Sequence, residues 1–304
     1  MSSTPAPRVF IVLLNWNGWE DTVECIASLQ KLHYENRKII VVDNASQDDS
    51  VEKIHQRFPH IKLIENEKNA GFSAGNNIGI KYALKHNAKY VWLLNNDTVV
   101  DSRALTPLVE KMEQQPEIGI CGSKLIYYDQ PDTIQVLGGG SYNKWLGVPR
   151  NFGQHKPVDM DFDPQHIEEN LDFIIGASMM VSRSFLEDVG LLCEDYFLYH
   201  EEIDWGLRAQ KKYELGFVPD SIVYHKEGQS IGATNLDMNN KSRLSDYYGI
   251  KNRLKISYKF HPWTLPLVYL TTLYSIFNRM KRNQWDRIPM ILKLFFTFNN
   301  NERY

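Results

Sequence analysis

Short apolar runs alternate with amphipathic stretches through the first third of this chain. Val9–Leu14 and Lys38–Val42 are rich in β-branched residues, and Asp21–Leu32 between them places apolar side chains on one helical stripe. This order of strand, helix and strand is typical of a parallel sheet whose faces are covered by helices. The sequence therefore predicts an α/β fold with a Rossmann-like, mostly parallel sheet.

The alternation continues as far as residue 100. Ser50–Phe58 and Ala74–His86 have the spacing of helices, while Ile61–Ile64 and Tyr90–Leu94 have the composition of strands. We therefore expect strands and helices to alternate over the whole of this part of the chain.

The middle of the chain is less regular. A helix over Arg103–Gln114 and strands around Ile118–Tyr127 precede Gly138–Pro164, whose Gly, Asn and Pro residues predict a loop-rich stretch. Regular structure is expected to resume over Leu171–Val181, in a helix near Glu202–Tyr213 and in a strand over Phe217–Tyr224.

The C-terminal region, residues 236–304, has a helical pattern and is expected to form an appendage. Within it, His261–Phe277 is rich in Trp, Leu, Tyr and Phe, and the basic residues Arg279, Lys281 and Arg282 follow. Prolines and hydroxyl side chains interrupt this run, which makes it a poor bilayer span, since a span needs roughly 20 apolar residues. Two interpretations stay open: a segment that lies in a membrane interface, and amphipathic helices that pack against the rest of the protein.

Charge and cysteine content exclude several classes of protein. A formal net charge of -3 gives no global attraction to nucleic acid, whose binding usually needs a basic face. Cys25, Cys121 and Cys193 lie far apart without CxxC spacing, so they indicate neither a disulfide framework nor a thiolate zinc site. The apolar run Val9–Leu14 is too short for a signal-peptide core. We therefore expect a cytoplasmic protein, at the inner face of the plasma membrane if the C-terminal region is interfacial.

Polar side chains follow each expected strand of the first third. Ligands of open α/β sheets bind where the carboxyl ends of parallel strands meet, so these side chains are candidates for a nucleotide cleft. Asp43 can accept hydrogen bonds from a ribose or a base, and Gly71 lets the backbone approach a ligand closely. Any one of them alone could be a turn residue. The candidates are Asn15, Asn17, Asp43, Asn44, Asn69, Gly71, Phe72, Asn95 and Asn96.

The Asn95-Asn96-Asp97 segment follows the strand over Tyr90–Leu94. A diphosphate leaving group needs its charge neutralised, and a divalent cation with oxygen ligands serves this purpose. Asp97 is the natural protein ligand for such a cation. The alternative is that this segment is only a turn at a strand end.

An acidic segment in the second half is the most specific constellation. Glu201, Glu202 and Asp204 follow an aromatic stretch, so we expect their carboxylates at the start of a helix that faces a cleft, where the helix dipole favours negative charge. Asp204 is the backup candidate for a catalytic carboxylate, and is otherwise expected to bind hydroxyl groups of a ligand or to pair with Arg208. His225 ends an apolar strand and is either a buried structural residue or a metal ligand.

Taken in order, these motifs resemble those of the family 2 glycosyltransferases of the GT-A fold. The resemblance covers about residues 8–235 and rests on the Leu-Asn-Trp-Asn, Asn-Ala-Gly-Phe, Asn-Asn-Asp and Glu-Glu segments. It implies a GT-A fold, a nucleoside-diphosphate-sugar donor and an inverting transfer of the sugar to a hydroxyl of a glycan or of a polyprenyl-diphosphate-linked glycan.

The resemblance also implies roles for single residues. Asp97 and His225 would hold a Mg2+ or Mn2+ ion at the donor diphosphate, and Glu202 would take the proton of the acceptor hydroxyl. Gly176 and Ala177 would line the acceptor side, and a loop over residues 228–232 would close over the diphosphate.

Two positions depart from the family pattern. The DxD motif of the family reads Asn-Asn-Asp here, so that Asn95 stands where a second metal carboxylate is common. The base position holds Glu202 in place of the commoner Asp, which adds one methylene group and makes Glu201 a candidate to share its role.

Within the family, the N-terminal segments look most like those of the bacterial rhamnosyltransferases that build cell-surface polysaccharides. This resemblance implies dTDP-rhamnose as the donor, with a UDP-sugar as the alternative. The expected division is a catalytic domain at 1–235, with a nucleotide-binding half at 8–100 and an acceptor half at 101–235, followed by the helical region at 236–304.

Two other functions are weighed against glycosyl transfer. Asn95 would also suit a nucleotide-sugar-binding or scaffold protein with a decayed active site, and hydrolysis of the donor would separate the two. An NAD(P)-dependent oxidoreductase needs a GxGxxG turn after its first strand, and the segment Leu14–Gly18 supplies none. The sequence leaves open the sugar, the base, the acceptor, the linkage and the oligomeric state, including a homo-oligomer.

Overall fold

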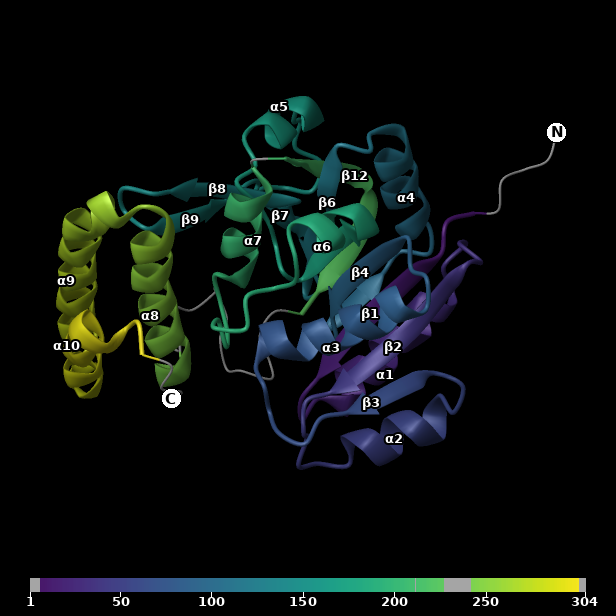
Figure 1. Cartoon of the computed structure of the whole chain (residues 1–304), viewed down its shortest axis with the longest axis horizontal. Helices are drawn as coiled ribbons and strands as arrows, with labels where there is room; N and C mark the ends of the chain where they lie inside the picture. The colour runs from purple at the N-terminus through teal and green to yellow at the C-terminus, as the bar shows by residue number, and fades with distance from the viewer. Residues whose placement is uncertain (1–5, 211, 227–241, 301–304) are drawn as a thin grey trace.

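The computed structural model describes residues 6–210, 212–226 and 242–300. Within these residues, nine strands form one central sheet (Figure 1): β1 (Val9–Asn15), β2 (Arg37–Asp43), β3 (Lys62–Glu65), β4 (Tyr90–Asn95), β5 (Thr98–Val100), β6 (Ile118–Tyr127), β7 (Gln130–Leu137), β11 (Ser178–Ser182) and β12 (Glu214–His225). The strand order is β3-β2-β1-β4-β11-β6-β12-β5, and β7 pairs with β6.

The first half of the sheet is parallel. β1 pairs in parallel with both β2 and β4, and β2 pairs in parallel with β3. On the other side of β4, the antiparallel strand β11 separates this half from the parallel pair of β6 and β12. The predicted α/β fold with strands that carry their carboxyl ends to one edge is therefore confirmed.

Strand β1 is apolar along its length because both faces of the sheet are covered. Val9, Ile11 and Leu13 belong to one hydrophobic core, and Phe10 and Val12 belong to the core on the opposite face. The helices that contribute to the first core are α1 (Trp19–Gln30), α2 (Ser50–Arg57) and α4 (Leu105–Gln114), and those that contribute to the second are α3 (Phe72–Lys85), α6 (Arg183–Asp188) and α7 (Glu201–Ala209).

The prediction that Gly138–Pro164 is loop-rich holds only in part, because two strands interrupt its turns. A second sheet, in the order β10-β8-β9, forms there from β8 (Gly139–Asn143), β9 (Val148–Asn151) and β10 (Phe173–Ile174), and α5 (Pro164–Glu169) follows β9. Gly139 and Gly140 belong to β8, where neighbouring backbone approaches them closely. A Cβ atom on Gly139 would lie 1.8 Å from the carbonyl oxygen of Phe173.

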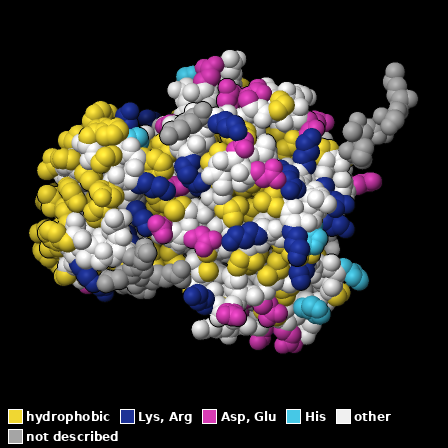
Figure 2. Space-filling model, viewed as in Figure 1, with side chains coloured by type: hydrophobic (Ala, Val, Ile, Leu, Met, Phe, Trp, Pro, Cys, Tyr) yellow, Lys and Arg dark blue, Asp and Glu magenta, His cyan; other side chains and the backbone are white. Residues whose placement is uncertain are grey.

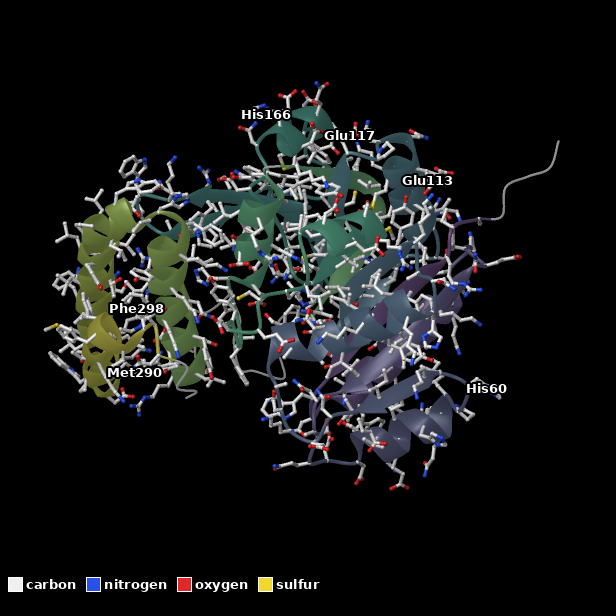
Figure 3. The ribbon with its side chains drawn as sticks, in the orientation of Figure 1. His60, Glu113, Glu117, His166, Met290 and Phe298 are labelled. Atoms are coloured by element: carbon white, nitrogen blue, oxygen red, sulfur yellow. The ribbon has the colours of Figure 1, made fainter. Side chains whose placement is uncertain are left out.

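The expected C-terminal helical region is present. It consists of α8 (Arg243–Phe260), α9 (Leu265–Lys281) and α10 (Ile288–Thr297), with short 3-10 turns before α9 and α10, and it stands beside the β8–β9 hairpin (Figure 1). Met290 and Phe298, labelled in Figure 3, belong to its own hydrophobic core. Ile256 of α8 packs with Tyr142, Phe173, Tyr196 and Ile203 in a further core, which joins the helices to the sheet region. Among the described helices, none has the length and apolar character that crossing a bilayer requires.

Candidate active site

A cavity of about 1110 Å³ lies at the carboxyl ends of β1, β4 and β12. Its other walls come from the start of α7, from β9 and from the helices α8 and α9. Most of the candidate residues line this one cavity, although they come from distant parts of the chain. The lining candidates are Asn44, Asn69, Gly71, Phe72, Asn95, Asn96, Asp97, Gly176, Ala177, Glu201, Glu202 and His225.

Four candidates do not line the cavity: Asn15, Asn17, Asp43 and Asp204. The predicted closing loop at 228–232 lies outside the described residues. Several other ionisable residues lie at the outer edge of the molecule in Figure 3, and none of them lines the cavity: His60, Glu113, Glu117 and His166.

Sheet topology brings Asp97 and His225 together. The antiparallel pairing of β5 with β12 sets Thr98 opposite His225, and the main-chain oxygen of Asp97 accepts a hydrogen bond from Lys226. As a result, Nε2 of His225 lies 3.1 Å from Oδ1 of Asp97, across 128 residues of sequence. Both residues are buried, at 6% and 8% relative exposure.

Gln135 of β7 orients the His225 ring. Its Oε1 lies 2.9 Å from Nδ1 of His225, so Nδ1 is the donor in that contact. In a neutral ring, Nε2 then carries a lone pair, and two acceptors face each other between His225 and Asp97. A proton on Nε2 or a cation between the two residues removes this repulsion.

The other two residues of the Asn-Asn-Asp segment differ in their contacts. Asn95 places Nδ2 3.4 Å from Nε2 of His225, next to the Asp97 pair. Asn96 turns toward the start of α1, where its Nδ2 donates to Oγ1 of Thr22 at 2.9 Å. Across the described residues, no group of three His, Cys, Asp or Glu side chains gathers as a metal site.

The polar ends of β1 and β2 are engaged with each other. Asn15 and Asp43 are buried, and Nδ2 of Asn15 donates to Oδ2 of Asp43 at 2.7 Å. Asp43 also accepts from the amide and the hydroxyl of Ser46. Asn17 accepts from the amide of Gln47, which ties the two loops together. In the structure, these three candidates therefore hold loops behind residues that line the cavity.

The loop before α3 has a required glycine. Asn44 donates to Oδ1 of Asn69 at 2.9 Å and to the carbonyl of Gly71, which adopts φ +86. A Cβ atom at Gly71 would lie 2.6 Å from the ring and from the carbonyl oxygen of Phe197. The amide of Phe72 donates to that same carbonyl at 2.7 Å, so this loop packs directly against the segment that leads into α7.

The acidic residues sit at the start of α7, as predicted from the sequence. The two residues before Glu201 have left-handed backbone conformations, with φ 68 at Tyr199 and φ 72 at His200. Consecutive left-handed residues that are not glycine are strained and persist only where packing holds them. This turn directs the first residues of α7, Glu201 and Glu202, to the cavity.

Burial sets the protonation of these two carboxyls. Burial raises the pKa of Glu202 to about 7. Burial, with the neighbouring Glu202 charge, raises the pKa of Glu201 well above its ordinary value. Among the described residues, no cation and no side-chain donor contacts either carboxyl, and Oε2 of Glu201 is buried without a hydrogen bond. Glu202 is therefore able to exchange a proton near neutral pH.

Asp204 lies one turn further along α7 and has a different environment. It is fully buried, and its two oxygens contact Arg208 at 2.6 Å and Lys259 at 2.5 Å. The structure thus makes it the partner of Arg208, one of its two predicted roles.

Gly176 and Ala177 lie where the β10–β11 connection meets the cavity. A Cβ atom at Gly176 would make only ordinary contact with Phe72, at 3.6 Å, so this glycine is not needed for space. The carbonyl of Ala177 accepts from the amide of Asn95, which fixes the connection beside the end of β4.

Helix α8 supplies a wall of the cavity that sequence reasoning missed. Tyr248 stacks on Phe197 with ring centroids 4.9 Å apart, and Tyr248 and Arg253 both line the cavity. Asn252 donates to the carbonyls of Leu198 and Tyr199 at 2.8 and 2.9 Å, and so holds the strained turn before Glu201. No local motif marks these residues, because their role depends on where α8 packs.

Comparison with known proteins gives a family match. The family described as "Glycosyl transferase family 2" matches residues 10–190. Relatives include the low-salt glycan biosynthesis hexosyltransferase Agl10 of Haloferax volcanii, 24% identical over 86% of this chain and 80% of the relative. They also include the N-acetylglucosaminyl-diphospho-decaprenol L-rhamnosyltransferase of Mycobacterium tuberculosis, 24% identical over 71% and 76%. The dTDP-rhamnosyl transferase RfbF of Shigella flexneri is 22% identical over 84% and 81%.

A solved structure supports the fold. The mannosyltransferase PcManGT of Pyrobaculum calidifontis, in complex with GDP-Man and Mn2+, superposes with a TM-score of 0.59. It is 13% identical in sequence, and the alignment covers 99% of this chain and 89% of that protein. The overall fold described above is therefore shared with that protein.

Proposed function

We propose that this chain, which belongs to glycosyl transferase family 2, is an inverting enzyme that moves a sugar from a nucleoside-diphosphate sugar to an acceptor hydroxyl. One observation carries this proposal: the Asp97–His225 pair and the Glu201–Glu202 pair line the same cavity. The first pair suits a departing diphosphate, and the second suits the removal of a proton.

The donor is proposed to be dTDP-rhamnose, with a UDP-sugar as the alternative. The names of two relatives, an L-rhamnosyltransferase and a dTDP-rhamnosyl transferase, support this choice. The nucleotide would occupy the part of the cavity lined by Asn44, Asn69, Gly71 and Phe72. Asn15, Asn17 and Asp43 would support this part from behind, through the hydrogen bonds that join the loops after β1 and β2.

The residues present fit a divalent cation that takes few ligands from the protein. Asp97 offers a carboxylate and His225 an imidazole, and Gln135 orients that imidazole as outer-shell partners of metal-bound histidines do. We assign Asp97 and His225 to hold Mg2+ or Mn2+, with Asn95 beside them. When bound, the cation would neutralise charge on the departing diphosphate.

Glu202 is the proposed base. Its pKa of about 7 places it where a general base is both ionised and able to accept a proton. It takes the proton of the acceptor hydroxyl while that oxygen attacks the anomeric carbon from the side opposite the leaving group. One such displacement inverts the anomeric configuration. Asn252 and the left-handed Tyr199 and His200 fix the position from which α7 starts, and hence the position of Glu202.

The acceptor is proposed to be a glycan linked to a lipid diphosphate, met at the inner face of the plasma membrane. The C-terminal helices expose large apolar side chains, which gather over that end of the molecule in Figure 2. Apolar patches of this kind mark sites of contact with membranes or proteins. The exposed residues include Trp263, Leu270, Tyr274, Phe277, Trp285 and Phe296.

Replacing Leu270 and Tyr274 by serine together tests this contact. Both side chains are more than half exposed, at 60% and 64%, so the fold should survive. We expect loss of binding to vesicles while transfer to a soluble acceptor continues. Vesicle binding equal to wild type would remove the membrane contact from the account.

The division into domains is proposed as a catalytic domain at 1–235, with halves at 8–100 and 101–235, and a helical region at 236–304. The boundary itself lies outside the described residues. Because α8 lines the cavity, the helical region would complete the acceptor side of the site.

Thermal melting with a panel of nucleotide sugars, in the presence of Mn2+, tests the proposed donor. A ligand at a hundred times its Kd adds about 2.7 kcal/mol of stability, which should raise Tm by roughly 5 °C. Release of nucleoside diphosphate from the same donor then separates an enzyme from a nucleotide-sugar-binding scaffold. Stabilisation without release would favour the scaffold, and no stabilisation by any nucleotide sugar would contradict both.

A further inference from the structure

The walls of the cavity differ in charge. At the ends of β4 and at the start of α7, the wall carries the acidic groups Asp97, Glu201 and Glu202. The wall from α8 and α9 contains Arg253 and, beside it in the lining, the buried pair of Asp246 and Arg279. Arg287 also pairs with Asp246, so this cluster holds more positive than negative charge.

Arg253 is the unusual member of the basic wall. Its relative exposure is 9%, and among the described residues no carboxylate lies within ion-pair distance of it. Its guanidinium donates to the carbonyl of Leu146 and to the hydroxyl of Thr271, which are both neutral. Burying a charged group without a counter-charge is unfavourable, and burial lowers the pKa of Arg253 accordingly.

The hydrogen bonds from Arg253 to the β8–β9 turn do not explain why this side chain is charged. Both acceptors are neutral, and the uncharged hydroxyl of Thr271 approaches the same turn, at 3.3 Å from the carbonyl oxygen of Leu146 and 2.9 Å from that of Val268. An arginine has five N–H donors, and Nη1 of Arg253 makes no hydrogen bond to a described residue. A buried guanidinium with donors to spare, on the wall of a cavity, is the arrangement that binds a planar or tetrahedral anion.

We infer that Arg253 forms a subsite for the diphosphate group of the acceptor. This inference rests on the proposed function, since the donor diphosphate is assigned to Asp97 and His225 and the acceptor hydroxyl to Glu202. An anion that binds at Arg253 would then be the diphosphate of the acceptor.

Helix α9 has one polar and one apolar face, which matches an acceptor that has both a charged group and an apolar chain. Ser275 and Arg279 of α9 line the cavity next to the basic wall. On the same helix, Leu270, Tyr274 and Phe277 are exposed at 60%, 64% and 48%. One helix thus presents polar groups to the cavity and apolar groups to the outside. A diphosphate bound at Arg253 would match the polar face, and an isoprenoid chain along the outside of α9 would match the apolar face.

Direct binding of farnesyl diphosphate to the full chain, followed by calorimetry, tests the subsite without any transfer reaction. Arg253→Gln should weaken this binding by about 10- to 100-fold, as expected for hydrogen bonds to a charged group. Binding of farnesol, which has the chain but no phosphate, should not change. The affinity for a nucleoside diphosphate with Mn2+ should also stay the same. An equal loss for the nucleoside diphosphate would assign Arg253 to the donor and overturn the inference.

Two further variants separate the charge from the packing role. Thr271→Val removes a hydroxyl that holds the same turn but keeps the arginine, so farnesyl diphosphate binding should persist. Arg253→Lys keeps the charge but loses the forked donors, so it should bind farnesyl diphosphate more weakly than wild type and more tightly than Arg253→Gln, and it tests the subsite if Arg253→Gln fails to fold. Loss of binding in Thr271→Val as large as in Arg253→Gln would show a structural role only, and binding in Arg253→Lys no tighter than in the neutral variant would show that the charge contributes nothing.

Failure of the Arg253 subsite and failure of the proposed function give different experimental results. A wild-type chain that binds farnesyl diphosphate through Arg253 but no nucleotide sugar would keep the subsite and refute the proposed function. A chain that transfers sugar from a nucleotide sugar, with Arg253→Gln binding farnesyl diphosphate as well as wild type, would refute the subsite alone.

Discussion

The loops after β1 and β2 and the start of α7 both bury carboxyl groups, but they treat them in opposite ways. Asp43 accepts hydrogen bonds from Asn15 and from two groups of Ser46. Glu201 and Glu202 receive no side-chain donor and no cation from the described residues, and burial raises the pKa of both. The difference teaches that the partners of a carboxylate, more than its burial, separate a structural acid from a reactive one.

The same contrast recurs within α7. Asp204 is as buried as Glu201, yet Arg208 and Lys259 neutralise it. Only the pair without cations lines the cavity. We therefore expect the unpaired glutamates, the paired aspartate and the Asp97–His225 pair to respond differently to substitution.

Glu202→Gln should give the largest effect. Glutamine keeps the shape of the side chain but cannot accept a proton, and general-base assistance is worth typically 10²–10⁴-fold. We expect kcat to fall by that factor while the affinity for the nucleotide sugar stays near wild type, both measured with the same donor. A parallel loss of donor affinity would show that Glu202 binds substrate and does not act as the base.

Asp204→Asn should act on stability and not on chemistry. The variant leaves Arg208 and Lys259 without their partner, and because both stay partly exposed we expect the free energy of unfolding to fall by about 2–3 kcal/mol. Denaturant unfolding measures the change. Transfer by the folded fraction should remain close to wild type, whereas a loss of kcat as deep as in Glu202→Gln would erase the contrast between the two acids.

Asp97→Ala should weaken the metal-dependent part of nucleotide binding. We expect the affinity for nucleoside diphosphate in Mn2+ to fall by about 10- to 100-fold, and the affinity in a chelator to stay unchanged. Titration under both conditions measures the difference. Asn96→Ala is the matched control, because Asn96 donates to Thr22 and stands next to the proposed metal residue. A metal-dependent affinity equal to wild type would remove Asp97 from the site.

Glu201→Gln should stabilise the protein, most clearly at high pH. A carboxyl whose pKa is raised in the folded state contributes no penalty below its unfolded pKa and destabilises increasingly as pH rises through the folded value. The variant lacks this penalty, so its Tm should match wild type near pH 4 and exceed it at pH 8. The expected gain is about 1 kcal/mol, the lower end of the cost of a buried polar group without a partner. An advantage that shrinks as pH rises would mean that Glu201 is stabilised as a carboxylate.

Much of the fold could be predicted from periodicity because the buried strands carry continuous apolar runs. β1, β2 and β4 lie within one residue of their expected ends. The β8–β9 hairpin could not be predicted in this way. Close backbone contacts require its glycines, and glycines in a sequence look like loop residues.

The site was partly predictable for a similar reason. Asp97, Glu202 and His225 stand at strand and helix ends that a pattern reveals, but their approach depends on the pairing of β5 with β12. The contributions of Asn252 and Arg253 depend on how α8 packs against the turn before α7. No local pattern carries that information.

The pH dependence of kcat/KM for sugar transfer, compared between wild type and Glu202→Gln, tests the central claim most directly. Because the base must be ionised and burial places the pKa of Glu202 at about 7, activity of the wild type should rise with pH and level off above that value. Glu202→Gln should be slow and should lose this rise. A variant that keeps the wild-type rate, or that keeps the same rise with pH, would contradict the assignment of Glu202 as the base.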